Sequence, residues 1–260
     1  MYNPSFRTNR NNVPILTGKE INIIAENYVR DFQRGVLENP APVDVESFIE
    51  HYLGMTPDYQ YLSHNGVYLG MTVFNDTDKV VVYSPHENKA KFVSAKARTV
   101  IIDNRLLEEN QQHRYRFTLG HEAGHDIFHS VYYSYDPCQF TFFDSPIPPM
   151  IQCRTDNPSA RKNSSQWDDH DWMEWHANRF SSCFLMPEAA VRLVATEYDP
   201  ALLTKDFTAR FRLVHRISDI FNVSLQAATY RLKDLSIFCK DDAGEYSFTP
   251  ACIDFEGCVV

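Results

Sequence analysis

The sequence predicts an α+β fold, in which a small and mostly antiparallel sheet packs on a helical core and further helices follow toward the C-terminus. Apolar residues recur at helical spacing near the N-terminus and through much of the second half of the chain. Between Tyr59 and Ile102, β-branched runs separated by polar turns indicate strands instead. Residues 121–125 spell H-E-x-x-H, a pattern that places both histidines on one helix.

Composition limits the classes of protein to consider. The chain has 260 residues, of which 43% are hydrophobic, enough to bury a core. Its net charge of −9 makes nucleic acid an unlikely partner, because a nonspecific binder needs a cationic face. The N-terminus is polar and no apolar run approaches membrane-spanning length, so we expect no membrane contact and a cytoplasmic location. The six cysteines should then be reduced thiols, and the alternative is that Cys138 and Cys153, which bracket a loop, meet a second metal or each other.

The first elements are helical. Residues 1–16 are expected to be a flexible N-terminus. A capping box at Thr17–Glu20 predicts a helix from there to about Val36. A second, short helix should run from about Asp44 to Leu53 and stop at Gly54.

The strands come next. Residues 67–74, 75–78 and 79–84 form a strand, turn, strand pattern, and residues 92–102 should add another strand. The helix that carries H-E-x-x-H should then run from about Glu108 to His129.

A long segment separates this helix from the remaining ones. Residues 134–168 are rich in proline and polar residues, which predicts a loop. Its aromatic stretch, Phe140 to Phe143, either covers a cleft or packs on the surface. A helix should follow from about Asp169 to Leu185, with two or three more in residues 188–236 and a short strand-rich tail at the end.

The H-E-x-x-H residues have the types and the spacing of a metal site. His121 and His125 lie one turn apart on the same helical face, so both imidazoles can reach one ion. Glu122 follows the first histidine, where it can accept a proton from the catalytic water. Zinc is the metal that we expect, although manganese or iron would also accept two histidines and a carboxylate.

A catalytic zinc needs a third protein ligand. Glu174 is the best candidate, because a carboxylate on an amphipathic helix beside aromatic residues is costly to bury unless it is paired or metal-bound. Ala177 is small enough to let another helix approach, and Asn178 lies one turn further along the same face. The other candidates downstream are Asp168, Asp169, His170, Asp171 and His176.

Two motifs together resemble the ImmA/IrrE metallopeptidase family. The first is residues 116–125, R-F-T-L-G-H-E-A-G-H, and the second is Glu174-x-x-Ala177-Asn178-x-Phe180 followed by Leu-Met-Pro at 185–187. The resemblance covers about residues 45–235. It implies that His121, His125 and Glu174 bind zinc and that Glu122 is the general base.

Two further residues have proposed roles beside the ligands. His129 continues the stripe of His121 and His125, but three ligands on one helix surround a tetrahedral ion poorly, so we expect it to support a ligand or line the cleft. Asn178 should orient a ligand or position substrate. The oxyanion partner stays open among Tyr132, Tyr133, His170 and His176.

The resemblance also predicts the domain organisation. Residues 17–187 should form a zinc metallopeptidase domain in which the proline-rich segment 134–168 is an insertion. Residues 188–260 should form a C-terminal helical region and tail.

The function implied is a site-specific cut in a regulatory protein, such as a helix-turn-helix DNA-binding repressor of a mobile element or stress response. An extended substrate could add to the sheet edge. One alternative is a non-catalytic metal-binding scaffold, including an antitoxin-type protein. Another is a DNA-binding regulator, because residues 217–233 have the pattern of a helix-turn-helix, with Gln226, Thr229, Arg231 and Lys233 on the candidate recognition helix.

Overall fold

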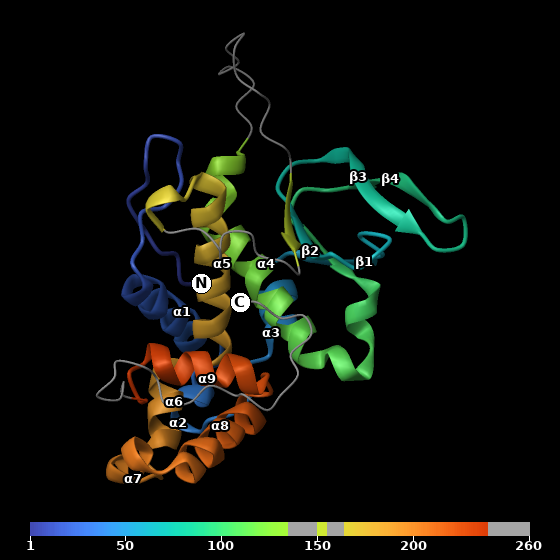
Figure 1. Ribbon diagram of the computed structural model, residues 1–260. Helices are drawn as coiled ribbons and strands as arrows, with labels where there is room; N and C mark the ends of the chain where they lie inside the picture. Colours follow the sequence, from blue (N-terminus) through green and yellow to red (C-terminus); the bar gives the residue numbers. More distant parts are fainter. Residues whose placement is uncertain (135–149, 155–163, 239–260) are drawn as a thin grey trace.

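The computed structural model describes residues 1–134, 150–154 and 164–238. Helix α4, Gln112–Tyr133, lies at the centre of the molecule, between helix α5, Asp169–Leu185, and the sheet (Figure 1). Helix α1, Gly18–Gln33, packs on the other side of α5. The predicted mixed α+β class is confirmed, and the helix that carries H-E-x-x-H has both a sheet and a helix as neighbours.

In the described residues the main sheet has four strands, in the order β1-β5-β2-β6. They are β1 Thr56–Gln60, β2 Tyr68–Val73, β5 Thr99–Asp103 and β6 Met150–Arg154. The β1–β5 pair is parallel, whereas β2 is antiparallel to both β5 and β6. A separate antiparallel hairpin, β3 Thr77–Ser84 and β4 Lys89–Ala95, extends away from the body (Figure 1).

The strands differ from the sequence prediction in three respects: their pairing, the length of one strand and the presence of another. The predicted strands 67–74 and 79–84 exist, but they do not pair with each other, because β2 is paired on both sides within the main sheet. The predicted strand 92–102 is broken near Arg98, whose φ of 65° is incompatible with a strand and whose guanidinium bonds to the Leu53 carbonyl and to Asp126. Strand β1, which contains Pro57, was not predicted.

The predicted loop 134–168 contains regular structure. Residues 150–154 are strand β6, and Ser164–Gln166 form a 3₁₀ turn. The strand was missed because it is short and flanked by turn-forming residues, so only its pairing with β2 defines it. The aromatic stretch from Phe140 to Phe143 lies outside the described residues, as does the predicted tail.

Helix boundaries follow local capping. Thr17 and Glu20 form the predicted capping box, and α5 has its own, between Asp168 and Asp171. Two 3₁₀ turns, Asn104–Leu107 and Glu109–Gln111, precede α4, so this helix begins later than predicted. The predicted helix before Gly54 consists of α3, Val45–Ser47, and a π-helical segment, Phe48–Leu53, and Gly54 adopts the left-handed conformation that ends it.

The N-terminal segment has defined contacts. Val13 is buried beside Tyr133, and the ring of Tyr2 packs edge-on against Tyr28. The side chain of Asn9 donates a hydrogen bond to Asp169 at the start of α5. Residues 1–16, expected to be flexible, thus contribute side chains to the packing around α1 and α5.

The remaining helices close the core on one side. They are α2 Gly35–Glu38, α6 Glu188–Ala195, α7 Pro200–Lys205, α8 Phe207–Phe221 and α9 Leu225–Asp234. Their apolar faces join those of α1, α4 and α5 in one large hydrophobic core. None of the helices in the described part of the chain has an apolar stretch long enough to cross a bilayer.

Candidate metal centre

Close contact between α4 and α5 places the candidate ligands. A Cβ at Gly124 would lie 2.9 Å from the Cα of Ala177, and one at Gly120 would lie 2.6 Å from the Oγ of Ser181. Both glycines are therefore needed for the helices to approach this closely. The prediction that Ala177 faces a neighbouring helix agrees with this packing.

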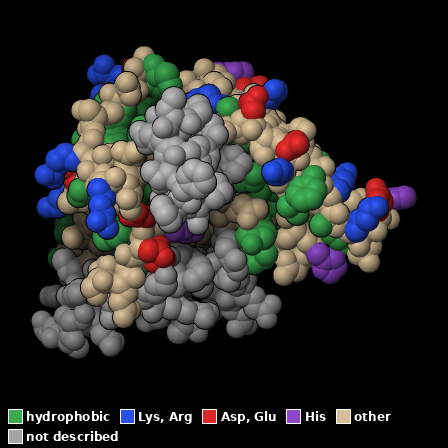
Figure 2. Space-filling view, turned by 90° about the horizontal axis from the view of Figure 1, so that it is seen from above, with side chains coloured by type: hydrophobic (Ala, Val, Ile, Leu, Met, Phe, Trp, Pro, Cys, Tyr) green, Lys and Arg blue, Asp and Glu red, His purple; other side chains and the backbone are tan. Residues whose placement is uncertain are grey.

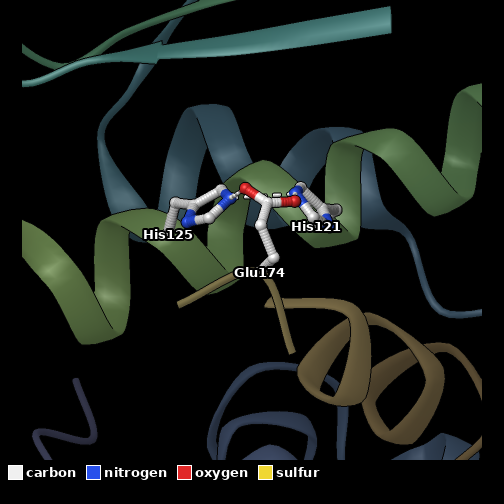
Figure 3. A group of neighbouring side chains, drawn as sticks. All are labelled: His121, His125 and Glu174. Atoms are coloured by element: carbon white, nitrogen blue, oxygen red, sulfur yellow. Dashed lines mark hydrogen bonds and ion pairs between the residues drawn. The ribbon is translucent and has the colours of Figure 1, made fainter. Parts of the chain in front are cut away.

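The side chains of His121, His125 and Glu174 converge between the two helices (Figure 3). The two Nε2 atoms lie 2.8 Å apart. Glu174 Oε2 lies 3.6 Å from His121 Nε2, and Glu174 Oε1 lies 3.4 Å from His125 Nε2. All three side chains are buried. The structure thus brings together the three residues that the two motifs indicated.

Asn178 forms a hydrogen bond with His121. Its Oδ1 lies 2.9 Å from His121 Nδ1. A carbonyl oxygen only accepts hydrogen bonds, so Nδ1 carries the proton and Nε2 of the neutral ring presents its lone pair toward Glu174. Burial, followed by the neighbouring His125, lowers the pKa of His121 to about 4, which keeps this ring neutral at pH 7.

His125 is held by a second histidine. His125 Nδ1 lies 2.9 Å from His129 Nδ1, and His129 Nε2 lies 3.5 Å from His176 Nδ1. Burial lowers the pKa of His125 to about 3 and that of His176 to about 4, and it holds the pKa of His129 well below its usual range. His129 therefore contacts His125 at Nδ1, whereas the other ring nitrogen of His125, Nε2, faces Glu174.

Glu122 lies against the sheet side of α4. Its Oε2 accepts a hydrogen bond of 2.6 Å from the Thr72 hydroxyl on β2, and its Oε1 is buried with no hydrogen-bond partner among the described residues. Burial raises the pKa of Glu122 well above its ordinary value. A Cβ at Gly70 would collide with Glu122 Oε1 and lie 2.7 Å from Thr118 Cγ2, so only glycine fits beside this carboxylate.

These residues fit a divalent transition metal. In a tetrahedral zinc site, nitrogen and oxygen ligands lie about 2.0–2.2 Å from the ion and therefore about 3.5 Å from each other. The two histidine–glutamate distances match this separation, whereas the two Nε2 atoms, 2.8 Å apart, would have to separate by several tenths of an ångström to admit the ion. Within the described part of the chain, Glu174 Oε1 is also buried without a hydrogen-bond partner, and burial raises the pKa of this carboxyl. A cation would satisfy the carboxylate and both lone pairs at once.

Cys153 lies at the same centre from the sheet side. Its Sγ, a ring nitrogen of His121 and a carboxylate oxygen of Glu122 all lie within 4.8 Å of one another. The sequence suggested Cys153 only together with Cys138, which lies outside the described residues, at a second metal or as a pair. It gave no sign of Gly70 and Thr72, because no local spacing connects the strands β2 and β6 to helix α4. The absence of a C-x-x-C pattern gave no signal for a cysteine in this position.

The other candidate ligands have different surroundings. Asp168 and Asp171 cap α5. Asp169 accepts hydrogen bonds from Asn9 and Asn11. His170 is exposed, and burial raises the pKa of Glu174 against the opposing effects of the neighbouring His121 and His170.

The helix-turn-helix pattern of residues 217–233 corresponds to α8, a left-handed Asn222 and α9. However, two of the four side chains proposed to contact DNA are buried. Thr229 bonds to the Leu225 carbonyl, and Arg231 is 1% exposed. This part of the DNA-binding hypothesis is wrong, because the inner face of α9 packs on α1 and α5.

Comparison with known proteins supports the peptidase resemblance. Residues 152–233 match the family model of the IrrE N-terminal-like domain, a peptidase family, which confirms the predicted resemblance over that range. The match includes Glu174 and Asn178 and begins after the H-E-x-x-H helix. No curated protein matches the chain in sequence.

Among solved structures, the chain is similar to a transcriptional regulator from Mycobacterium tuberculosis, with 15% sequence identity and a TM-score of 0.39. The alignment covers 92% of this chain and 56% of that protein, so the chain spans little more than half the length of the regulator. A likeness at this level bears on neither activity nor partner.

Proposed function

We propose that this chain, whose residues 152–233 form an IrrE N-terminal-like domain, is a zinc-dependent endopeptidase that makes a site-specific cut in a regulatory protein. The observation that carries the proposal is the convergence of His121, His125 and Glu174 from two helices, beside a buried Glu122. The peptidase family implies a protein substrate. A helix-turn-helix repressor is the substrate class that the sequence resemblance suggests.

In this proposal His121, His125 and Glu174 hold the ion, which when bound supplies a Lewis acid that polarises the substrate carbonyl and activates water. Asn178 and His129 keep the two imidazole rings in the orientation that binding requires. Asn178 contacts Nδ1 of His121, and His129 contacts Nδ1 of His125, so Nε2 of each ring is left to face the ion.

Glu122 is the general base. The Thr72 hydroxyl fixes one of its oxygens, which leaves Oε1 to accept a proton from water and deliver it to the leaving amine. Burial raises the pKa of this carboxyl, so that it holds a proton more readily than an exposed glutamate during the transfer.

One experiment on three variants tests the proposal. Wild type, Glu122→Gln and Glu174→Ala are purified and their zinc content is measured by mass spectrometry. The same proteins are incubated with a panel of helix-turn-helix repressors. We expect one zinc per chain and a defined fragment for wild type, and sharply reduced zinc for Glu174→Ala, because two histidines alone do not complete a site. Glu122→Gln should keep its zinc and cleave at least about 100-fold more slowly.

The control is Glu197→Ala, which removes an exposed glutamate that lies 3.9 Å from Arg216. This variant should behave as wild type. Zinc-free wild type, or normal cleavage by Glu122→Gln, would contradict the proposal. Full zinc without cleavage of any repressor would instead favour the non-catalytic scaffold.

A further inference from the structure

Strand β6 carries Cys153 into the candidate metal centre. Cys153 is the register partner of Gly70 across the antiparallel β2–β6 pair. Directly paired residues project to the same face of a sheet. Gly70 faces Glu122, so Cys153 faces α4 as well. The burial of Ile151 and Cys153, with Gln152 between them less buried, agrees with this orientation.

The two candidate ligand groups in the described residues share one histidine. His121, His125 and Glu174 form one group, and His121, Glu122 and Cys153 form the other. A catalytic zinc site has three protein ligands and an open position, whereas four protein ligands make a closed site. A thiolate is a strong zinc ligand. The thiol of Cys153 is grouped with His121 and Glu122 and not with His125 or Glu174, so it approaches the shared histidine from the side of the general base, where the catalytic water is expected.

Two buried oxygen atoms support a ligand role for this cluster. Glu122 Oε1 and Glu174 Oε1 are both fully buried, and neither has a hydrogen-bond partner in residues 1–134, 150–154 and 164–238. When its sulfur binds an ion, the Cys153 thiol gives up its proton to solvent, and no oxidant or reductant is needed.

We propose that Cys153 is a fourth protein ligand, which closes the metal site while strand β6 is paired with β2. The inference rests on the proposed function for the identity of the other three ligands. While β6 is paired with β2, it occupies the edge of β2, so an extended substrate cannot add to that edge. Release of Cys153 would open the position for water and the strand edge for a peptide.

Cobalt(II) reports a thiolate ligand without any measurement of activity. The full-length chain is loaded with Co²⁺ in place of zinc, and its near-ultraviolet and visible spectra are recorded together with the metal content. We expect one cobalt per chain and a sulfur-to-cobalt charge-transfer band in wild type. Cys153→Ser should keep one cobalt, because three ligands remain, and should lose the band. Cys153→Ala provides a second variant in case serine perturbs the strand.

The matched control is Cys183→Ser, which alters the other buried thiol in the described residues, on α5 beside Arg231. Its band should equal that of wild type. Added azide probes the open position: it should change the visible spectrum of Cys153→Ser and leave that of wild type unchanged.

The outcomes separate this inference from the proposed function. Cobalt bound without the band in wild type, or a band of full intensity in Cys153→Ser, overturns the Cys153 ligand and leaves the three-ligand site intact. If azide changes the visible spectrum of wild type as much as that of Cys153→Ser, the Cys153 ligand is also overturned. No cobalt binding by wild type overturns the three-ligand site itself, and the Cys153 inference with it.

Discussion

At the scale of single residues, the candidate ligands depend on neighbours that fix their orientation. Asn178 reaches His121 with one hydrogen bond and contacts the opposite side of the ring from Glu174. Thr72 does the same for Glu122. Each contact sets which atom of a functional side chain is left available, and each comes from a different element of the fold.

Asn178→Ala should weaken zinc binding by about 10–100-fold, because His121 loses the acceptor that selects its tautomer. The zinc dissociation constant is measured by competition with a chelating dye. Ser182→Ala, one turn further along α5, is the control and should match wild type. An unchanged dissociation constant in Asn178→Ala would show that the hydrogen bond does not support the ligand.

Some residues of the candidate metal centre can be recognised in the sequence, and others cannot. His121, Glu122 and His125 are visible because their chemistry is repeated at helical spacing within five positions. Gly70 and Cys153 are not visible, because their importance arises when β2 and β6 pair and face α4. A strand register that joins residues more than 80 positions apart leaves no local pattern.

At the scale of elements, the contact between α4 and α5 determines whether the centre forms. Gly124 allows the backbone of Ala177 to approach, and Glu174 lies one turn before that contact on α5. The separation of the two helices therefore sets the distance from the carboxylate to the imidazoles.

Gly124→Ala should lower the free energy of unfolding by about 1–3 kcal/mol, because the new methyl group meets backbone that cannot rotate away. This loss should exceed the gain of about 1 kcal/mol in helix propensity. Urea unfolding and zinc titration are measured together, and zinc affinity should also fall. Gly35→Ala is the control: its Cβ would meet nothing within 4 Å, so stability should be unchanged or slightly higher. Equal behaviour of the two variants would exclude close packing as the cause.

Helices were predicted more accurately than the sheet, for a physical reason. The bounds of α5 follow from its capping box and from the Met-Pro that ends it, which are local signals. The pairing of β2 with β5 and β6, rather than with β3, depends on which faces can be buried together. Such pairing is decided by the tertiary structure.

At the scale of the whole molecule, Arg231 joins three helices in the core. Its guanidinium donates to the Met186 carbonyl at the end of α5, to Asn22 on α1 and to Asp234 on its own helix. Because the side chain is 1% exposed, its loss would leave the Met186 carbonyl and the Asn22 amide oxygen without this buried donor, whereas Asp234 also pairs with Arg179. The C-terminal helices are thereby attached to the helices that hold the candidate metal centre.

Arg231→Met should lower the free energy of unfolding by about 3 kcal/mol, because it leaves buried acceptors without a donor. Arg216→Met is the control, since Arg216 lies 3.9 Å from Glu197 at the surface and such pairs contribute about 0–1 kcal/mol. Chemical denaturation of both variants gives the comparison. If the two lose the same amount of stability, the buried network does not attach the C-terminal helices.

The separation of the ligands along the chain has a consequence for the lifetime of the protein. Between His125 and Glu174 lie 48 residues, so an ion bound by both acts as a removable cross-link that the unfolded chain cannot form well. An ion present at 1,000 times its dissociation constant would stabilise the folded state by about 4 kcal/mol. Zinc supply would then govern how long each molecule survives proteolysis, and metal starvation would remove the protein as well as its chemistry.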